Sequence, residues 1–376
     1  MIWLALLSLL IWIGLIFAHG QFWQSGPELP VGGTPADAPP VAIVVPARNE
    51  AETIGAVLTS LLAQDYPGSL RIVLVDDAST DATGAIGRAI IDPRLTVIAG
   101  TERPAGWSGK LWAVAQGIEA AREAAPAPEL LLLCDADIVH EADHLSSLVA
   151  VAQAGGLDLV SEMVALNCRS WAERALVPAF VYFFQLLYPF ARVNDPMSAT
   201  AAAAGGTMLL RVRALDRIGG IAAVRGALID DVALAGAVKR GGRIWLGHTQ
   251  RARSLRAYPR AGDIWRMIAR TAYVQLRFSP WLLAGTILGM ALVWLLPPLA
   301  AIFGHGTMRA AGLLAWVLAA GSFLPTLGRF HLSPFWAPVL PAIAGFYMAA
   351  TIGSAIDHYR GRGVVWKGRS YPGQGA

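Results

Sequence analysis

The sequence predicts an α/β domain with a mostly parallel, Rossmann-like sheet, attached to membrane-spanning helices. Strand-like and helix-like segments alternate through residues 41–163, and four apolar runs without any charge lie outside them. Charged residues make up 15% of the 376 residues, against about 25% in an ordinary soluble domain. This composition excludes a disordered chain and a typical cytosolic enzyme.

The uncharged runs are residues 1–18, 281–303, 310–328 and 334–356. Each approaches the ~20 residues that a helix needs to cross the hydrocarbon core. No Lys or Arg precedes the first run and no clear small-residue cleavage site follows it, so we expect an uncleaved anchor, with a signal peptide as the alternative. The expected organisation is an N-terminal anchor (1–18), a Gly- and Pro-rich linker (19–40), an α/β catalytic domain (41–250), a basic interfacial segment (251–280), a membrane helix cluster (281–356) and a basic tail (357–376).

The α/β domain shows two kinds of segment in alternation. Short runs of β-branched residues and leucine predict buried strands, and apolar residues that recur every three or four positions predict helices. The predicted strands are Val41–Val45, Leu70–Val75, Leu95–Ile98, Leu130–Cys134 and Leu157–Met163. The predicted helices are residues 51–63, 80–91, 111–125 and 141–154. This order favours right-handed crossovers between parallel strands, with ligands bound beyond the carboxyl ends of the strands.

Residues 177–190 are apolar and rich in aromatic side chains, and they include Pro178 and Pro189. A segment of this length is short for a membrane span. Two interpretations stay open: a core helix, or an interfacial helix whose aromatic residues lie at headgroup level and face a lipid acceptor. Trp281 and Trp336, near the spans, are expected to be interface anchors.

Positive charge is concentrated just before the membrane cluster. Between Lys239 and Arg277 there are nine Arg and one Lys against a single acid, Asp263. A juxtamembrane flank that follows the positive-inside tendency is the favoured interpretation, and it places the protein in the inner (cytoplasmic) membrane with its α/β domain in the cytoplasm. Attraction to anionic headgroups or to a diphosphate donor are the alternatives. Nucleic acid is not an expected partner, because no binding motif accompanies the charge.

The basic tail conflicts with this topology. One span before a cytoplasmic domain and three after it would place the C-terminus outside, whereas basic residues favour the inside. Either a Pro-interrupted apolar segment is re-entrant, or the tail departs from the rule. The basic residues concerned are Arg360, Arg362, Lys367 and Arg369.

Acidic residues follow predicted strands at three places. Asp76 and Asp77 close the second strand, residues 135–137 (Asp-Ala-Asp) follow the fourth, and Asp230 and Asp231 lie in a later segment. A single Asp after a strand is often only a helix cap. Two carboxylates as close as those of Asp-x-Asp repel one another unless a cation lies between them, and a hard divalent cation can bridge carboxylates to phosphates. The combination predicts a cation site at this edge of the sheet.

These motifs resemble glycosyltransferase family 2, the nucleotide-sugar-dependent enzymes with the GT-A fold, over about residues 41–278. The resemblance implies a nucleotide-diphosphate sugar as donor, with a UDP-sugar favoured. Pro46 would lie against the base, Asp77 would accept the uracil N3–H, and Lys110 would face the diphosphate. The donor-side residues that the resemblance implies are Pro46, Arg48, Asn49, Glu50, Asp77, Lys110 and Asp135. A simple ion pair between Arg48 and Glu50 is an equal alternative for those two.

The resemblance also implies a metal ligand and a base. Asp137 would bind Mg²⁺ or Mn²⁺, with Asp135 beside it and nearer the ribose or sugar. A departing diphosphate needs such a cation, and an acceptor hydroxyl needs a carboxylate base, because its own pKa is far above 7. Asp230 and Asp231 stand where the family usually has Glu-Asp, so the base role falls to Asp231.

The acceptor side is implied by two segments. Residues 204–208 match the small-residue acceptor loop of the family, with Gly205 and Gly206 at its centre. Processive polysaccharide synthases of the superfamily carry Gln-x-x-Arg-Trp before the membrane, whereas this chain has Gln275 and Arg277 one residue closer together and no Trp. That departure argues against polymer synthesis and leaves the acceptor roles of Gln275 and Arg277 as predictions.

More narrowly, residues 106–114, 205–242 and 266–273 resemble the hopene-associated glycosyltransferases, a membrane subgroup linked to hopanoid lipids. The resemblance implies inverting transfer to a lipid hydroxyl, with a hopanoid as the expected acceptor. Alternatives are a polyprenyl-phosphate glycosyltransferase and a processive polysaccharide synthase. A non-catalytic membrane protein or transporter is disfavoured, because the apolar runs contain no ionisable residue for a midplane site.

The remaining chemistry-bearing residues are expected to be structural. His140, His144 and His248 lack partners at metal-ligand spacing, so they are interpreted as structural or surface residues. Cys134 and Cys168 are too few for a disulfide framework or a zinc site and are expected to be reduced, buried thiols.

Overall fold

The computed structural model describes residues 1–361, 364–366 and 369–371. Two compact units share the chain. The helical unit comprises Met1–Gly26, Cys168–Ala191 and Tyr258–Ala376, and the sheet unit comprises Pro27–Asn167 and Arg192–Ala257. This division cuts across the expected α/β domain and interfacial segment. Arg362 and Lys367 of the expected basic tail lie outside the described residues.

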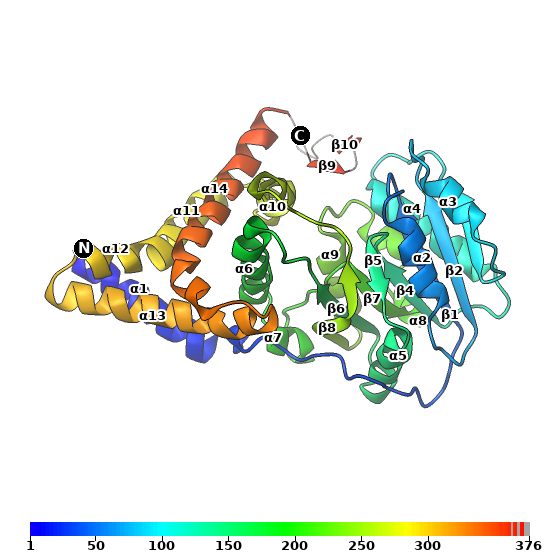
Figure 1. The fold of residues 1–376 in the computed structure, drawn as a ribbon, viewed down its shortest axis with the longest axis horizontal. Helices are drawn as coiled ribbons and strands as arrows, with labels where there is room; N and C mark the ends of the chain where they lie inside the picture. Colours follow the sequence, from blue (N-terminus) through cyan, green and yellow to red (C-terminus); the bar gives the residue numbers. More distant parts are fainter. Residues whose placement is uncertain (362–363, 367–368, 372–376) are drawn as a thin grey trace. The chain divides into compact units, whose positions relative to one another are not determined.

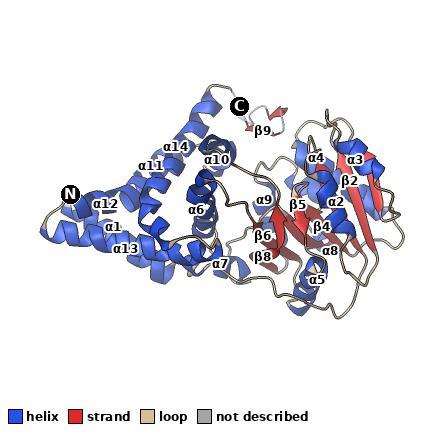
Figure 2. Ribbon diagram, in the orientation of Figure 1, coloured by secondary structure: helices blue, strands red, loops and turns tan. Residues whose placement is uncertain are grey.

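The sheet unit is built on an eight-stranded sheet in the order β3-β2-β1-β4-β7-β6-β8-β5 (Figure 1 and Figure 2). The strands are β1 (Val41–Ala47), β2 (Leu70–Asp76), β3 (Leu95–Ala99), β4 (Leu130–Cys134), β5 (Ile138–His140), β6 (Leu159–Ala165), β7 (Thr207–Arg211) and β8 (Ile244–Ser254). The pairs β2–β3, β1–β2, β1–β4 and β6–β8 are parallel, and the pairs β4–β7, β6–β7 and β5–β8 are antiparallel. Six of these eight strands run in the same direction and β5 and β7 run against them, so the predicted α/β class with a mostly parallel sheet is confirmed.

β7 runs against its neighbours because the connection from β6 returns to the same edge of the sheet. β7 begins beside the carboxyl end of β4, where Thr207 pairs with Cys134. A parallel strand would need a crossover to the opposite edge, whereas a strand that re-enters at this edge pairs antiparallel. The arrangement places Gly205 and Gly206, which precede β7, at the carboxyl end of β4.

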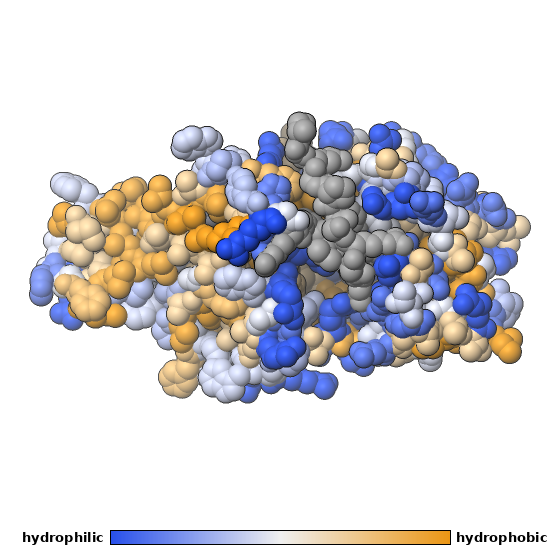
Figure 3. Space-filling model, turned by 90° about the horizontal axis from the view of Figure 1, so that it is seen from above, coloured by the Kyte–Doolittle hydropathy of each residue, from blue (hydrophilic) through white to orange (hydrophobic). Residues whose placement is uncertain are grey.

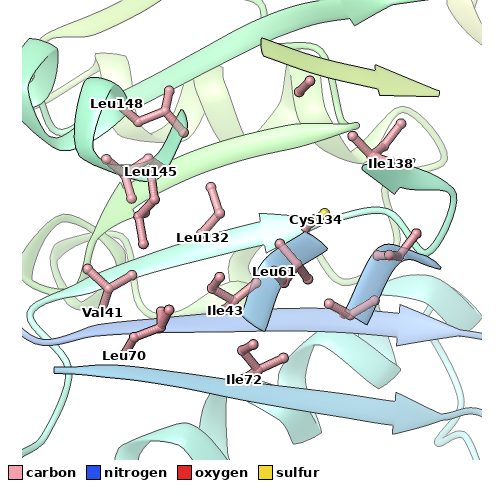
Figure 4. Packing of buried hydrophobic residues seen from close by; sticks show 14 of the residues in the cluster. Val41, Ile43, Leu61, Leu70, Ile72, Leu132, Cys134, Ile138, Leu145 and Leu148 are labelled. Atoms are coloured by element: carbon pink, nitrogen blue, oxygen red, sulfur yellow. The ribbon is translucent and has the colours of Figure 1, made fainter. Parts of the chain in front are cut away.

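The core of the sheet unit covers both faces of the central strands. All seven residues of β1 are buried, as expected for a strand with helices on both sides. On one face the strands pack against α2 (Ile54–Leu62) and α5 (His144–Ala154), in the cluster drawn in Figure 4. On the other face α4 (Gly109–Arg122) approaches so closely that a Cβ at Gly117 would lie 2.4 Å from Val44 Cγ1. Further helices are α3 (Thr83–Ala89), α7 (Phe190–Asn194), α8 (Val212–Arg217), η2 (Ile221–Val224) and α9 (Asp230–Lys239).

The helical unit contains three segments long and apolar enough to cross a membrane, Pro280–Phe303, Gly306–Arg329 and Pro334–Tyr359. They contain the three uncharged runs expected in the C-terminal part. The first uncharged run forms α1 (Ile2–Ala18), a shorter apolar helix. Figure 3 shows hydrophobic residues gathered over the part that holds α1, α12 and α13. The elements of the three segments are α11 (Pro280–Met290), η3 (Ala291–Leu295), α12 (Leu296–Phe303), α13 (Gly306–Arg329), η4 (Pro334–Val339) and α14 (Leu340–Tyr359).

A pair of prolines explains the hydrogen bond between α1 and the segment Pro280–Phe303. In a helix, the carbonyl of Val293 would accept an N–H from the residue four or five positions later. Those positions are Pro297 and Pro298, and proline has no N–H to donate. Trp12 of α1 donates its indole N–H to that carbonyl at 2.9 Å. The backbone forms a π-helical turn over Ala291–Leu295, directly before the prolines.

The aromatic segment at 177–190 belongs to α6 (Trp171–Leu187), which begins earlier than expected at a capping box of Ser170 and Glu173. Tyr182 is fully buried, and its hydroxyl lies 2.6 Å from Ser322 Oγ of α13. These contacts support the core-helix interpretation. The exposed Trp171 packs edge-on against Trp336, with ring centroids 4.9 Å apart.

Candidate active site

The carboxyl ends of β1, β2 and β4 bring the acidic motifs to one edge of the sheet. Ala47 pairs with Asp76 across β1 and β2. The amide of Asp77 then donates to the carbonyl of Ala47 at 2.8 Å. On the other side of β1, the amide of Asp135 donates to the carbonyl of Gly206 at 3.1 Å. Pro46, near the end of β1, therefore shares this edge with Asp77, Asp135 and the glycine loop.

The turn after β1 is hydrogen-bonded to the turn after β2. Arg48 donates from its guanidinium to the carbonyls of Asp77 and Ala78, at 2.5 and 2.9 Å. Asn49, with a φ of +52°, accepts the amide of Thr80 at 2.8 Å. Arg48 thus braces the turn that carries Asp77, and Glu50 is held by Arg256.

Lys110 joins two of the acidic motifs. It lies in the first turn of α4, whose N-cap Ser108 accepts the amide of Leu111. Its ammonium lies 2.8 Å from Asp135 Oδ1 and 3.6 Å from Asp230 Oδ2. Burial lowers the pKa of Lys110, but the two carboxylates outweigh it and hold the pKa above its usual value. The lysine therefore stays charged and draws the Asp-x-Asp and Asp-Asp motifs into one site.

Asp231 stands at the start of α9 as a carboxylate that is hard to ionise. Its Oδ2 accepts the amide of Gly205 at 2.9 Å, and its Oδ1 accepts the amide of Val232 at 2.8 Å. Burial raises the pKa of Asp231 to about 7; the nearby Asp230 adds to this, and Lys110 opposes it. A carboxylate with this pKa is suited to take a proton near neutral pH.

The absence of a side chain at Gly205 leaves room for this contact. A Cβ at Gly205 would lie 3.2 Å from Asp231 Oδ2 and 3.5 Å from Lys110 Nζ. The neighbouring Gly206 has only ordinary contacts, with Ile138 atoms 3.6 Å from a Cβ built there. The glycine at 205 therefore lets the backbone of this loop approach the carboxylate, where a Cβ would make a tight contact.

Asp137 lies on the other side of the Asp-x-Asp motif. Its Oδ2 accepts the hydroxyl of Ser254 at 3.1 Å and the guanidinium Nε of Arg256 at 2.8 Å. Arg256 also donates to Glu50 Oε1 at 2.8 Å. Sequence reasoning missed Arg256, because it lies in a stretch with many arginines and no motif marks it out.

The oxygen ligands of this edge fit a hard divalent cation. Burial raises the pKa of Asp135; Lys110 opposes this, and Asp137 adds to it. A cation between Asp135 and Asp137 would relieve that repulsion, and a hard divalent cation there could also take phosphate oxygens as ligands. Among the described residues no three His, Cys, Asp or Glu side chains converge as a complete metal site. The protein alone therefore offers a partial site of carboxylate oxygens.

Gln275 and Arg277 belong to the helical unit, whereas the acidic motifs belong to the sheet unit. Gln275 ends α10 (Ala261–Gln275) and donates to the hydroxyl of Tyr188 at 2.6 Å. Arg277 follows with a φ of +52°. Their acceptor-side roles stay predictions.

A buried chain of polar side chains behind the Asp-x-Asp motif was also missed. His144 Nε2 lies 2.6 Å from Glu162 Oε2, the Nδ1 atoms of His144 and His140 lie 3.0 Å apart, and His140 Nε2 lies 3.0 Å from Cys134 Sγ. All four side chains are buried. His140 ends β5 and His144 begins α5. Glu162 comes from an apolar strand, so only the fold shows the connection. Cys168 is half-buried, not fully buried as expected.

The buried polar side chains around His140 should make the free energy of unfolding depend on pH. Burial lowers the pKa of His140 well below its usual value, with His144 adding to the effect. The unfolded chain gains a proton there below about pH 6.5, whereas the folded chain does not. The stability contributed by neutral His140 is therefore present above that pH and lost as the pH falls. We expect the thermal midpoints of wild type and His140→Gln to differ most at pH 8 and to converge by pH 5. A constant difference over this range would contradict neutral burial.

The activity at this edge should have an acid limb set by the Asp230–Asp231 pair. Because Asp230 contributes to the raised pKa of Asp231, Asp230→Asn should shift the acid limb of kcat/KM to lower pH. Profiles from pH 5 to 9 on both proteins check this. A limb that stays in place, or moves to higher pH, would show that Asp231 is not the titrating group.

A model of Glycosyl transferase family 2 matches residues 42–219. Succinoglycan biosynthesis protein ExoO of Rhizobium meliloti (strain 1021) is 37% identical over 148 residues, 37% of this chain and 40% of that protein. Dodecaprenyl-phosphate galacturonate synthase of Rhizobium johnstonii is 28% identical over 135 residues, 35% of this chain and 38% of that protein. The chain thus spans about two fifths of the length of these relatives.

A solved structure extends the likeness to the fold of nearly the whole chain. The mannosyltransferase PcManGT from Pyrobaculum calidifontis, in complex with GDP-Man and Mn²⁺, matches with a TM-score of 0.52 and 22% identity, covering 93% of this chain and 99% of that one. The family model starts at β1 and takes in the Asp-x-Asp motif and the glycine loop. Residues 42–219 therefore resemble glycosyltransferase family 2, and the fold belongs to the GT-A class.

Proposed function

We propose that the protein is a membrane-bound, metal-dependent, inverting glycosyltransferase that moves a sugar from a nucleotide-diphosphate sugar to a lipid hydroxyl. One observation carries the proposal: Lys110, inside the segment that matches the family 2 model, pairs both with Asp135 of the Asp-x-Asp motif and with Asp230 of the Asp230–Asp231 pair. Leaving-group and base chemistry would then share a single site.

We assign donor binding to the hydrogen-bonded turns that follow β1 and β2. Asp77 would accept the uracil N3–H of a UDP-sugar, with Pro46 against the base and Arg48 and Asn49 holding the turn. Asp137 and Asp135 would hold Mg²⁺ or Mn²⁺, which supplies positive charge for the departing diphosphate. The Mn²⁺ in the PcManGT structure supports a divalent metal.

The reaction would be a direct displacement. Asp231 would take the proton of the acceptor hydroxyl as its oxygen attacks the anomeric carbon from the face opposite the diphosphate. The bond between the anomeric carbon and the diphosphate oxygen breaks as the new bond forms. Because the two bonds lie on opposite faces, the anomeric configuration inverts. Lys110 would hold Asp135 and Asp230 in place and offer positive charge near the leaving group.

The acceptor is proposed to be a lipid, of the hopanoid class. Three helical segments long and apolar enough to span a membrane support this, and the basic stretch before them favours an inner-membrane protein with a cytoplasmic sheet unit. A second candidate is transfer to a polyprenyl phosphate, because one relative is named dodecaprenyl-phosphate galacturonate synthase.

A donor screen tests the proposal. Full-length protein in detergent with bacterial lipid extract is incubated with a panel of UDP- and GDP-sugars and with Mn²⁺, Mg²⁺ or a chelator. We expect one donor to release its nucleoside diphosphate and form a glycolipid, only when metal is present. Absence of turnover with every donor, or equal turnover with the chelator, would refute it.

A further inference from the structure

Arg256 is held in an unusually defined position beside the Asp-x-Asp motif. The amide of Leu255 donates to the carbonyl of Asp137 at 2.7 Å, and Asn167 Nδ2 donates to the carbonyl of Arg256 at 2.8 Å. Ser254 Oγ accepts the amide of Arg256 at 3.1 Å and donates to Asp137 at the same distance. The backbone is fixed from both sides, so the guanidinium is aimed at one place.

That place is a pair of carboxylates. Arg256 Nε lies 2.8 Å from Asp137 Oδ2 and Nη2 lies 2.8 Å from Glu50 Oε1. The Asp137 and Glu50 side chains are 11% and 12% exposed, whereas the Arg256 side chain is 35% exposed. The carboxylates are thus covered mainly on the protein side, and the cation that holds them can still reach solvent.

The two carboxylates of the Asp-x-Asp motif therefore have different protein cations. Lys110 holds Asp135, and Arg256 holds Asp137. A divalent cation bound to Asp137 and a guanidinium at contact distance from the same oxygen repel one another strongly at such short range. At the same oxygen, each would therefore weaken the binding of the other.

We propose that Arg256 competes with the divalent metal for Asp137 and, once the metal displaces it, binds the diphosphate of the donor. This rests on the proposed function, in which Asp137 is a metal ligand. Glu50 keeps hold of the guanidinium during the exchange, so the cation moves only a short way. The planar, permanently charged fork of arginine suits two phosphate oxygens as well as two carboxylate oxygens.

The exchange couples metal and donor. Metal alone must displace Arg256 without any compensating contact, so it binds weakly. With nucleoside diphosphate present, the displaced guanidinium gains phosphate oxygens, so each ligand raises the affinity for the other by the same factor. A purely structural Arg256 would behave differently, because its loss would weaken both ligands alike.

The test measures Mn²⁺ binding and UDP binding separately on the full-length protein in detergent. Free Mn²⁺ is followed by electron paramagnetic resonance without nucleotide, and UDP binding by calorimetry at saturating Mn²⁺. For Arg256→Gln we expect Mn²⁺ alone to bind about fivefold tighter or more, and UDP with Mn²⁺ to bind about tenfold weaker. The matched control is Arg251→Gln, which removes an arginine of β8 that pairs with Asp143; both affinities should stay as in wild type.

Two further variants separate the possible failures. Asp137→Asn should lose Mn²⁺ binding; unchanged binding would refute the metal role itself. If Asp137→Asn loses Mn²⁺ but Arg256→Gln binds Mn²⁺ no tighter than wild type, the competition is wrong while the metal role stands. Arg256→Lys keeps the charge but cannot span both carboxylates, so a smaller gain in Mn²⁺ affinity is expected. If Arg256→Gln does not fold, Arg256→Lys serves as the test instead. An Mn²⁺ affinity of Arg256→Lys no higher than that of wild type would then overturn the proposal.

Discussion

Replacement of Asp231 by Asn should lower kcat by about 100- to 10,000-fold, the range supplied by a positioned general base. The amide cannot take the proton of the acceptor hydroxyl. Its oxygen can still accept the amide of Gly205, so the loop and the fold should remain. Turnover of the donor identified by the screen is the measurement.

The control for Asp231→Asn is nucleotide binding. UDP in the presence of Mn²⁺ should bind the variant about as well as wild type, because the proposed donor contacts lie at Asp77, Lys110 and Asp137. A variant that keeps full turnover would remove Asp231 from the reaction. A variant that loses both turnover and binding would point to a structural role.

Asp137→Ala should have the second large effect, on binding as well as rate. Loss of a metal ligand should weaken the binding of UDP with Mn²⁺ and lower turnover by about 100- to 1,000-fold, as for loss of other charge-stabilising groups. Isothermal titration with and without Mn²⁺ measures it. The expected signature is that Mn²⁺ no longer improves UDP binding.

The matched control for Asp137→Ala is Asp143→Ala. Each aspartate pairs with an arginine of β8 or of the residues just after it, Asp137 with Arg256 and Asp143 with Arg251. Only Asp137 belongs to the proposed metal site, so Asp143→Ala should keep metal-dependent binding. Equal losses in the two variants would mean that the effect is on the fold.

The local pattern of apolar residues was sufficient to predict five of the strands, β1 to β4 and β6. Leu130–Cys134 has the predicted bounds, and the other four predicted strands differ by at most two residues at either end, because their apolar runs are short and bounded by breakers. β7 and its direction could not be predicted. Its orientation follows from the route of the chain between β6 and β7, and no local periodicity records that route.

The site was predictable where chemistry follows a strand end. Asp77 and Asp135 stand out because each follows a strand, at the carboxyl edge where such sheets bind ligands. Asp231 lies at the start of α9, with α8 and η2 between it and β7, so its role was implied by the family resemblance alone. Arg256 could not be found in this way, since its partner Glu50 is 206 residues earlier in the chain. The link from Glu162 to Cys134 was hidden for a similar reason: a buried carboxylate inside an apolar strand gives no periodic signal.

Direct displacement of the nucleoside diphosphate by a lipid hydroxyl, deprotonated by Asp231, should invert the anomeric configuration. The anomeric configuration and linkage of the glycolipid product test it, measured by proton and phosphorus NMR after reaction with an α-linked nucleotide-sugar. We expect a β-linked sugar on a carbon-bound oxygen. An α-linked product, or a sugar whose anomeric proton couples to phosphorus, would contradict it.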